Sequence, residues 1–137
     1  MGHAVVMSVD EVLARARRGV RRVTPEECVA AAADGALVVD TRTAAQRNTE
    51  GELPGAVVID RTVLEWRLDP ASPSRIPEAV SYDLLVIVVC CQGFSSSLAA
   101  ASLRTVGLHR ATDLIGGTAA WRAAGLALHA GPADVRS

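Results

Sequence analysis

Short apolar runs alternate with longer stretches of helical periodicity along the chain. Runs of β-branched and aliphatic residues predict four short strands, at residues 36–39, 56–59, 84–89 and 111–115. Spacing and capping signals predict helices at residues 8–18, 25–34, 43–49, 62–69, 95–105 and 118–124. Strands that alternate with helices are typical of a parallel sheet covered on both faces. We therefore expect a single α/β domain with a central parallel sheet.

Two of the predicted helices have strong start signals. Ser8 and Thr24 are each followed three residues later by glutamate, which is the pattern of a capping box. Pro25 then occupies the first helical position of the second helix. In the helix at 62–69 we expect Val63, Leu64 and Trp66 to pack on the core.

Composition and charge exclude several classes of protein. The chain has 137 residues and a net charge of −1, so it offers no electrostatic basis for binding nucleic acid or an anionic membrane. No apolar run approaches the roughly 20 residues that span a bilayer, and the first residues do not resemble a secretory signal. Three cysteines, an odd and small number, favour a reducing cytoplasm. The histidines and cysteines show no metal-site spacing, and we expect no metal or organic cofactor.

A basic run and a cysteine near the start of the chain have unremarkable interpretations. The arginines between residues 15 and 22 favour a solvated helix face, with an anion-binding patch as the alternative. Cys28 lies among valine and alanine on its predicted helix. We expect it to be a small core residue, with a redox role as the alternative.

The stretch at residues 84–101 has the strongest chemical signal. A buried strand ends directly at Cys90 and Cys91, and Gly93 and three serines follow before the next helix. We expect Ser95, Ser96 or Ser97 to be the N-cap of that helix. The two thiols are thus predicted at the carboxyl end of a strand, facing a helix N-terminus, where ligands bind and thiols lose their proton readily.

Four motifs in register resemble the rhodanese-like family. The family forms D-x-R, G-H-I-P-G-A, C-x-x-G-x-R-S and G-G-x-x-x-W find counterparts at residues 40–42, 51–56, 90–96 and 116–121. The resemblance covers about residues 22–128 and implies a three-layer α/β domain. Residues 1–21 are then an N-terminal helical extension, and residues 129–137 are a loose C-terminal tail.

The chain departs from the family pattern at three positions. Glu52 stands where histidine is common, Ser95 where many active sulfurtransferases have arginine, and Cys91 adds a second thiol. The loop C-x-x-G-F-S-S-S, together with W-R-L-D-P at residues 66–70, resembles a subgroup of single-domain rhodaneses. The missing loop arginine argues against thiosulfate as the substrate.

The resemblance implies a sulfurtransferase in which a cysteine carries sulfur as a persulfide. Only Cys90 has glycine three residues on, so it is the expected nucleophile. Successive backbone N–H groups of the loop and the helix end would stabilise its anion. Expected substrate-binding residues are Cys91, Gln92, Gly93, Phe94, Ser95, Ser96, Arg67 and Arg42. The expected partners are a small sulfur donor and a thiol or cyanide acceptor, with a protein sulfur carrier as a further candidate.

Several alternatives remain open. Arg42 either binds the donor or pairs with Asp40, which we interpret as structural. Cys91 is either a resolving thiol or a bystander, and the bystander interpretation is favoured. A cysteine-dependent phosphatase is rejected, because it needs C-x5-R to clamp phosphate and the sixth residues after Cys90 and Cys91 are Ser96 and Ser97. The main alternative to an enzyme is a non-catalytic or weakly catalytic module that carries persulfide or senses oxidants.

Overall fold

The computed structural model describes residues 6–137, and its centre is a five-stranded parallel sheet with the strand order β4-β3-β1-β2-β5. The strands are β1 (Leu37–Asp40), β2 (Val57–Val58), β3 (Val86–Val89), β4 (Thr112–Asp113) and β5 (Asp134–Val135). The helices are α1 (Val9–Arg17), α2 (Pro25–Ala33), α3 (Ala44–Glu50), α4 (Leu64–Leu68), α5 (Ser95–Thr105) and α6 (Gly117–Ala123), with a 3-10 turn, η1 (Arg61–Val63), before α4. The predicted α/β class and parallel sheet are confirmed.

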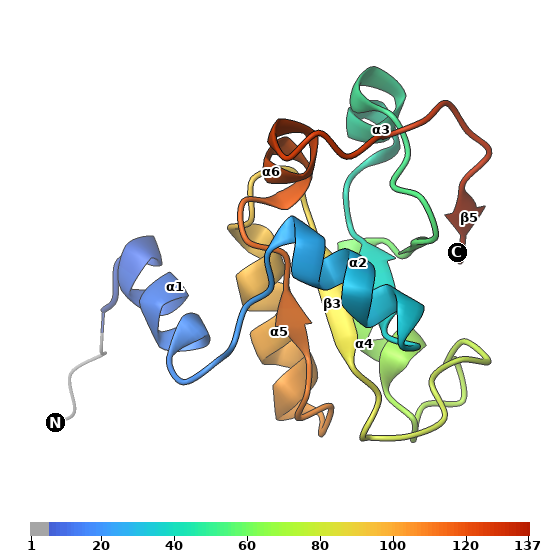
Figure 1. Cartoon of the computed structure of the whole chain (residues 1–137). Coiled ribbons are helices and arrows are strands. Elements are labelled where there is room, and N and C mark those ends of the chain that lie inside the picture. Colours follow the sequence, from blue (N-terminus) through green and yellow to red (C-terminus); the bar gives the residue numbers. More distant parts are fainter. Residues whose placement is uncertain (1–5) are drawn as a thin grey trace, which may run out of the picture.

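The sheet has a hydrophobic core on each face. Along β3, Val86 and Val88 pack on the side of α4 and α5, whereas Ile87 and Val89 pack on the opposite side. That opposite side is covered by α2 and α6, through Cys28 and other apolar side chains. Figure 1 shows α2 in front of the sheet and α5 behind it. Because every residue of β3 is buried, its sequence is a continuous apolar run rather than an alternating one.

The register brings the carboxyl ends of the strands to one edge. Asp40, the last residue of β1, lies between Val58 of β2 and Val89 of β3. The segments that follow these strands therefore start side by side. This edge carries the residues of the cysteine loop.

Two local predictions about the helices are wrong. Helix α5 begins one residue after Phe94, and no side chain caps it, so the serines form its first turn instead of its N-cap. The hydroxyl groups of Ser96 and Ser97 instead donate hydrogen bonds to Asp113 of β4. In α4 the core side chains are Leu64 and Leu68, whereas Trp66 is 61% exposed.

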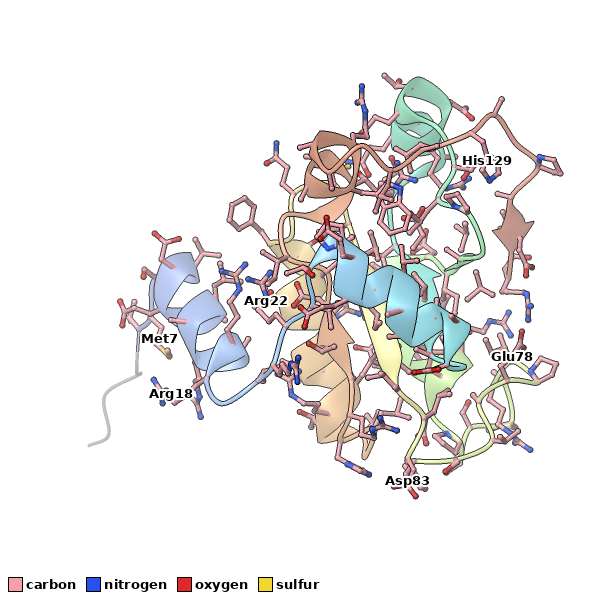
Figure 2. All side chains as sticks on the ribbon, in the orientation of Figure 1. Met7, Arg18, Arg22, Glu78, Asp83 and His129 are labelled. Atoms are coloured by element: carbon pink, nitrogen blue, oxygen red, sulfur yellow. The ribbon has the colours of Figure 1, made fainter. Side chains whose placement is uncertain are left out.

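The end of the chain also differs from the expected loose tail. Residues Asp134–Val135 pair with β2 as the fifth strand, and Arg136 donates hydrogen bonds to Glu78 and Asp134. His129 forms an antiparallel bridge with Glu52, and Figure 2 shows Glu78 and His129 on the side of the molecule where β5 lies. Two paired residues are too short a run for sequence periodicity to detect.

Helix α1 lies beside α5, at the opposite side of the molecule from β5 (Figure 1). Ser8 and Glu11 form the predicted capping box. Arg104 of α5 donates a 2.6 Å hydrogen bond to the carbonyl oxygen of Ala16. Within residues 6–137, no helix combines the length and the apolar character needed to cross a bilayer.

Candidate active site

The loop between β3 and α5 wraps around the sulfur atom of Cys90. The backbone N–H of Gly93 donates to Cys90 Sγ over 3.2 Å, and Cys90 is 7% exposed. Gly93 has φ of +80°, and a Cβ atom there would lie 2.6 Å from the backbone nitrogen of Gly116. Both the left-handed conformation and the close contact require glycine.

The first turn of α6 holds the same loop from the other side. The backbone N–H groups of Thr118 and Ala119 donate to the carbonyl oxygens of Cys90 and Cys91, over 2.9 and 3.0 Å. A Cβ atom on Gly117 would lie 2.3 Å from the Cys90 oxygen. The Gly-Gly pair therefore permits the helix to approach the cysteine backbone.

An open cavity of about 580 Å³ lies at this edge, where open parallel sheets bind ligands. Its walls come from the loop, from the end of β1, from α3 and from α6. The lining residues are Thr41, Arg42, Gln46, Glu50, Cys90, Cys91, Gln92, Phe94, Ser95 and Ala119.

The environment of Cys90 favours its thiolate. Burial alone raises the pKa of this thiol, but hydrogen bonds from the Ser96 and Ser95 hydroxyls and from backbone N–H groups outweigh it and lower the pKa. The Ser96 hydroxyl also lies 2.7 Å from Asp113 Oδ2, and its single proton serves one acceptor at a time. For the Gly93 N–H, Cys90 Sγ is the one acceptor among residues 6–137.

Cys91 has the opposite environment. Its thiol donates to Glu50 Oε1 over 3.3 Å. Burial, followed by this hydrogen bond and the negative charge of Glu50, raises the pKa of Cys91 to about 11. Of the two adjacent cysteines, Cys90 is therefore the one whose surroundings favour the thiolate.

Comparisons with known proteins identify the family of the chain. Residues 24–124 match the family described as the rhodanese-like domain. The chain belongs to that family. This rhodanese-like domain is 33% identical over 102 residues to "Thiosulfate sulfurtransferase GlpE" of Pseudomonas entomophila, covering 74% of this chain and 84% of the relative. The relative of the same name from Pseudomonas fluorescens is 32% identical over the same length.

Solved structures share the fold. A protein of unknown function from Rhodopseudomonas palustris, described as a possible tyrosine phosphatase, superimposes with a TM-score of 0.79 and 27% identity, covering 93% of this chain and 98% of that one. A thiosulfate sulfurtransferase from Pseudomonas aeruginosa gives 0.66 and 22%, over 88% of this chain and 22% of that one. The predicted family is confirmed, whereas membership of a loop subgroup stays a prediction.

Most of the predicted site residues of this rhodanese-like domain come together. Four of the loop residues predicted to contact a ligand line the cavity with Cys90, namely Cys91, Gln92, Phe94 and Ser95, and Phe94 is 57% exposed. Gly93 and Ser96 are buried and do not line the cavity. Arg42 lines the cavity but is 3% exposed, and its guanidinium donates to Asp40 Oδ2 over 2.8 Å and to the carbonyl oxygen of Gly51 over 2.9 Å. These contacts correspond to the structural alternative for Arg42.

Arg67 does not reach the cavity. It lies on α4 and donates to the carbonyl oxygens of Ser74, over 2.9 Å, and Ser137, and it is not among the residues that line the cavity. The structure therefore does not bring Arg67 and Cys90 together. The expectation failed because amphipathic spacing identifies the packed face of a helix but not the edge of the sheet beside which the helix lies.

Three polar residues that sequence reasoning missed support the loop from behind. Asp113 of β4 is buried and accepts hydrogen bonds from Ser96, Ser97 and Arg22, over 2.7, 2.8 and 2.8 Å. Arg17 and Arg22 both donate to the carbonyl oxygen of Gly93. The expectation of a wholly solvated basic run is thus wrong for these two arginines. The one available signal was Asp113 inside a short predicted strand, since a buried carboxylate needs partners.

Proposed function

We propose that this protein is a sulfurtransferase that carries a sulfane sulfur as a persulfide on Cys90. The observation that supports the proposal best is the position of Cys90 Sγ beside a 580 Å³ cavity, with the Gly93 N–H 3.2 Å away. The lowered pKa of this thiol increases the fraction present as the nucleophilic thiolate. The names of the GlpE relatives point to the same activity.

The transfer consists of two displacements at sulfur. The Cys90 thiolate attacks the outer sulfur of a donor, the bond from that sulfur to the rest of the donor breaks, and the donor leaves with the electron pair. With thiosulfate, the products are the Cys90 persulfide anion and sulfite. A thiolate or cyanide then attacks the outer sulfur, forms an acceptor persulfide or thiocyanate, and restores the Cys90 thiolate. Backbone N–H groups of the loop stabilise both anions of Cys90.

The cavity favours a donor with little negative charge. Each charged side chain that lines it within residues 6–137 already has a partner: Arg42 pairs with Asp40, and Glu50 accepts the Cys91 thiol. A dianion such as thiosulfate would be bound by backbone N–H groups and by neutral side chains such as Ser95 and Gln92, and it would face the Glu50 carboxylate. We therefore expect thiol persulfides, small or carried on a protein, to be better donors than thiosulfate.

The second candidate is a persulfide carrier or thiol redox sensor with little turnover. Within residues 6–137, the cation that lines the cavity, Arg42, is already paired with Asp40, and this favours the carrier or sensor. Without an unpaired cation the protein would react slowly with anionic donors, and Cys90 would remain a thiolate for long enough to meet an oxidant or a partner. Phosphatase chemistry is not proposed, since Ser96 stands where C-x5-R requires arginine. The three free cysteines fit a reducing compartment, and we propose the cytoplasm.

The test is intact mass spectrometry after incubation with thiosulfate, mercaptopyruvate or a protein persulfide. We expect the mass to increase by one sulfur atom and to return to its original value on addition of cyanide. Cys90→Ser abolishes the gain, whereas Cys28→Ala, which removes a buried thiol of α2, retains it. Full sulfur transfer by Cys90→Ser from every donor would overturn the assignment, and sulfur uptake without release to any acceptor would favour the carrier.

A further inference from the structure

Both the N–H and the carbonyl oxygen of Gly93 form hydrogen bonds. Its N–H donates to Cys90 Sγ over 3.2 Å. Its carbonyl oxygen accepts two hydrogen bonds from guanidinium groups, from Arg17 Nη2 over 2.6 Å and from Arg22 Nη2 over 3.0 Å. Bonds from ionised donors are about twice as strong as bonds between neutral groups, so this carbonyl is one of the most firmly held points of the loop.

Arg17 reaches the loop from the last turn of α1. Besides Gly93, its Nε donates to Ser97 Oγ over 2.9 Å, and the guanidinium lies 6.0 Å from the centre of the Phe94 ring. Arg15 of the same helix and Arg18, which follows it, are exposed, and Figure 2 shows Arg18 pointing away from the domain. Arg17 is therefore the basic residue of α1 that donates hydrogen bonds to the loop and to the first turn of α5.

Arg22 is placed by the edge of the sheet. Val23 bridges Leu114 in parallel, so the chain before it runs beside β4. The guanidinium of Arg22 binds both carboxylate oxygens of Asp113, over 2.8 and 3.1 Å, and the same Nη2 reaches Gly93. Figure 2 shows Arg22 between α1 and the body of the domain. Both arginines precede the segment that matches the family, which begins at residue 24.

We propose that Arg17 and Arg22 are positioning residues that hold the Cys90 loop in its anion-binding conformation, so that the N-terminal segment is part of the reactive site. They touch neither the cavity nor the sulfur and act through Gly93. The inference rests on the proposed function only in taking Cys90 as the reacting thiol.

The physical effect has two parts. A peptide group is planar and trans, so fixing the Gly93 oxygen also fixes the direction of the Phe94 N–H in the same peptide group. The Gly93 N–H belongs to the preceding peptide group, and holding the Gly93 carbonyl restricts rotation about the bonds of its Cα atom, which helps to keep that N–H on the sulfur. Two positive charges behind the loop also favour an anion in front of it. The other charged or titratable groups around the loop are Arg42, Glu50, Cys91 and Asp113.

The experiment measures the rate of Cys90 alkylation by iodoacetamide against pH, in a Cys91→Ser background so that one thiol of the loop reacts. We expect Arg17→Gln to shift the midpoint upward by about 0.5–1 pH unit, which lowers the rate below the midpoint about three- to tenfold. Arg15→Gln, an exposed arginine of the same helix, leaves the profile unchanged. Arg17→Lys keeps the positive charge but lacks the planar guanidinium that bonds Gly93 and Ser97 at once, so we expect its midpoint to lie between that of Arg17→Gln and that of the protein that retains Arg17.

Thermal unfolding of each variant separates positioning from simple stabilisation. A merely structural role of Arg17 would lower the melting temperature and leave the alkylation profile where it was. A profile of Arg17→Gln that overlays that of Arg15→Gln overturns the proposal. Should Arg17→Gln not fold, Arg17→Met, which keeps a long side chain, is judged by the same two outcomes. Alkylation needs no sulfur donor, so a shifted profile in a protein that takes up no sulfur refutes the proposed function alone.

Discussion

Cys90 and Cys91 are neighbours in the chain, but their sulfur atoms have opposite hydrogen-bonding partners. Cys90 Sγ accepts an N–H, whereas the Cys91 thiol donates to the Glu50 carboxylate. An accepted hydrogen bond stabilises a thiolate, and a donated one stabilises the neutral thiol. The two residues are therefore expected to react at different pH, with Cys90 ionised first. A resolving role for Cys91 would require its proton to be removed during the reaction.

We predict that the single substitution Glu50→Gln lowers the pKa of Cys91 from about 11. The amide removes the negative charge, but burial, the larger cause, remains, so the pKa falls only part of the way to that of a free thiol. Iodoacetamide alkylation of Cys91 against pH, in a Cys90→Ser background, measures the change. Glu26→Gln, an exposed carboxylate of α2, is the matched control. An unchanged midpoint in Glu50→Gln would show that Glu50 does not control this thiol.

At the scale of the elements, the backbone of helix α6 approaches the cysteine loop closely at Gly117. Gly117→Ala would place a Cβ atom 2.3 Å from the Cys90 oxygen, at a φ of +60°. Gly125→Ala is a matched control, because its φ is +81° and its Cβ would meet nothing within 4 Å. Both variants lose about 1 kcal/mol to the left-handed backbone, and overpacking costs Gly117→Ala a further 1–3 kcal/mol, roughly.

Urea unfolding of the two glycine variants measures the difference in stability. Alkylation of Cys90 in the same samples tests whether the loop moves, and we expect a slower reaction in Gly117→Ala only. Equal stabilities and equal rates would contradict the close packing of α6 on the loop.

The start of α1 and α2 could be predicted from the sequence, but the start of α5 could not. Capping boxes at Ser8 and Thr24 involve residues three positions apart, so local sequence contains the whole signal. Ser96 and Ser97 resemble caps in the same way, yet their hydroxyls bind Asp113, 16 or 17 residues away. A serine-rich helix start is thus ambiguous until its distant partners are known.

For the whole molecule, the parallel sheet explains which part of the site was predictable. Motifs that follow β1 and β3 had to meet at one edge, and the cavity with Cys90 is found there. The supporting cations were not predictable, because Arg17 and Arg22 contact Gly93 across 76 and 71 residues of sequence. Their positions depend on how α1 and the edge of β4 pack, which no periodicity describes. Arg67 was predicted to face the site, yet it does not line the cavity and donates to Ser74 and Ser137.

The whole protein is also expected to lose stability at alkaline pH through Cys28. Burial raises the pKa of this thiol from 9.0 to about 11. A raised pKa in the folded state stabilises the fold below the unfolded pKa, and that stabilisation is lost as pH rises through the folded pKa. Between pH 9 and 11 the unfolded state therefore releases a proton that the folded state retains. Cys90, whose pKa is lowered, contributes with the opposite sign and below this window.

Urea unfolding at about pH 8 and about pH 10.5 measures this contribution, which should remove ~2 kcal/mol at the higher pH. Cys28→Ala has no proton to release at this position, so its stability should fall less between the two pH values, although it starts from a lower value because of the lost packing. The difference between the two slopes isolates Cys28 from the other groups that titrate in this range. If the stability of the wild-type protein and that of Cys28→Ala fell equally between the two pH values, the Cys28 thiol would titrate equally in the folded and unfolded states. That result would conflict with the burial of Cys28 between α2 and the sheet.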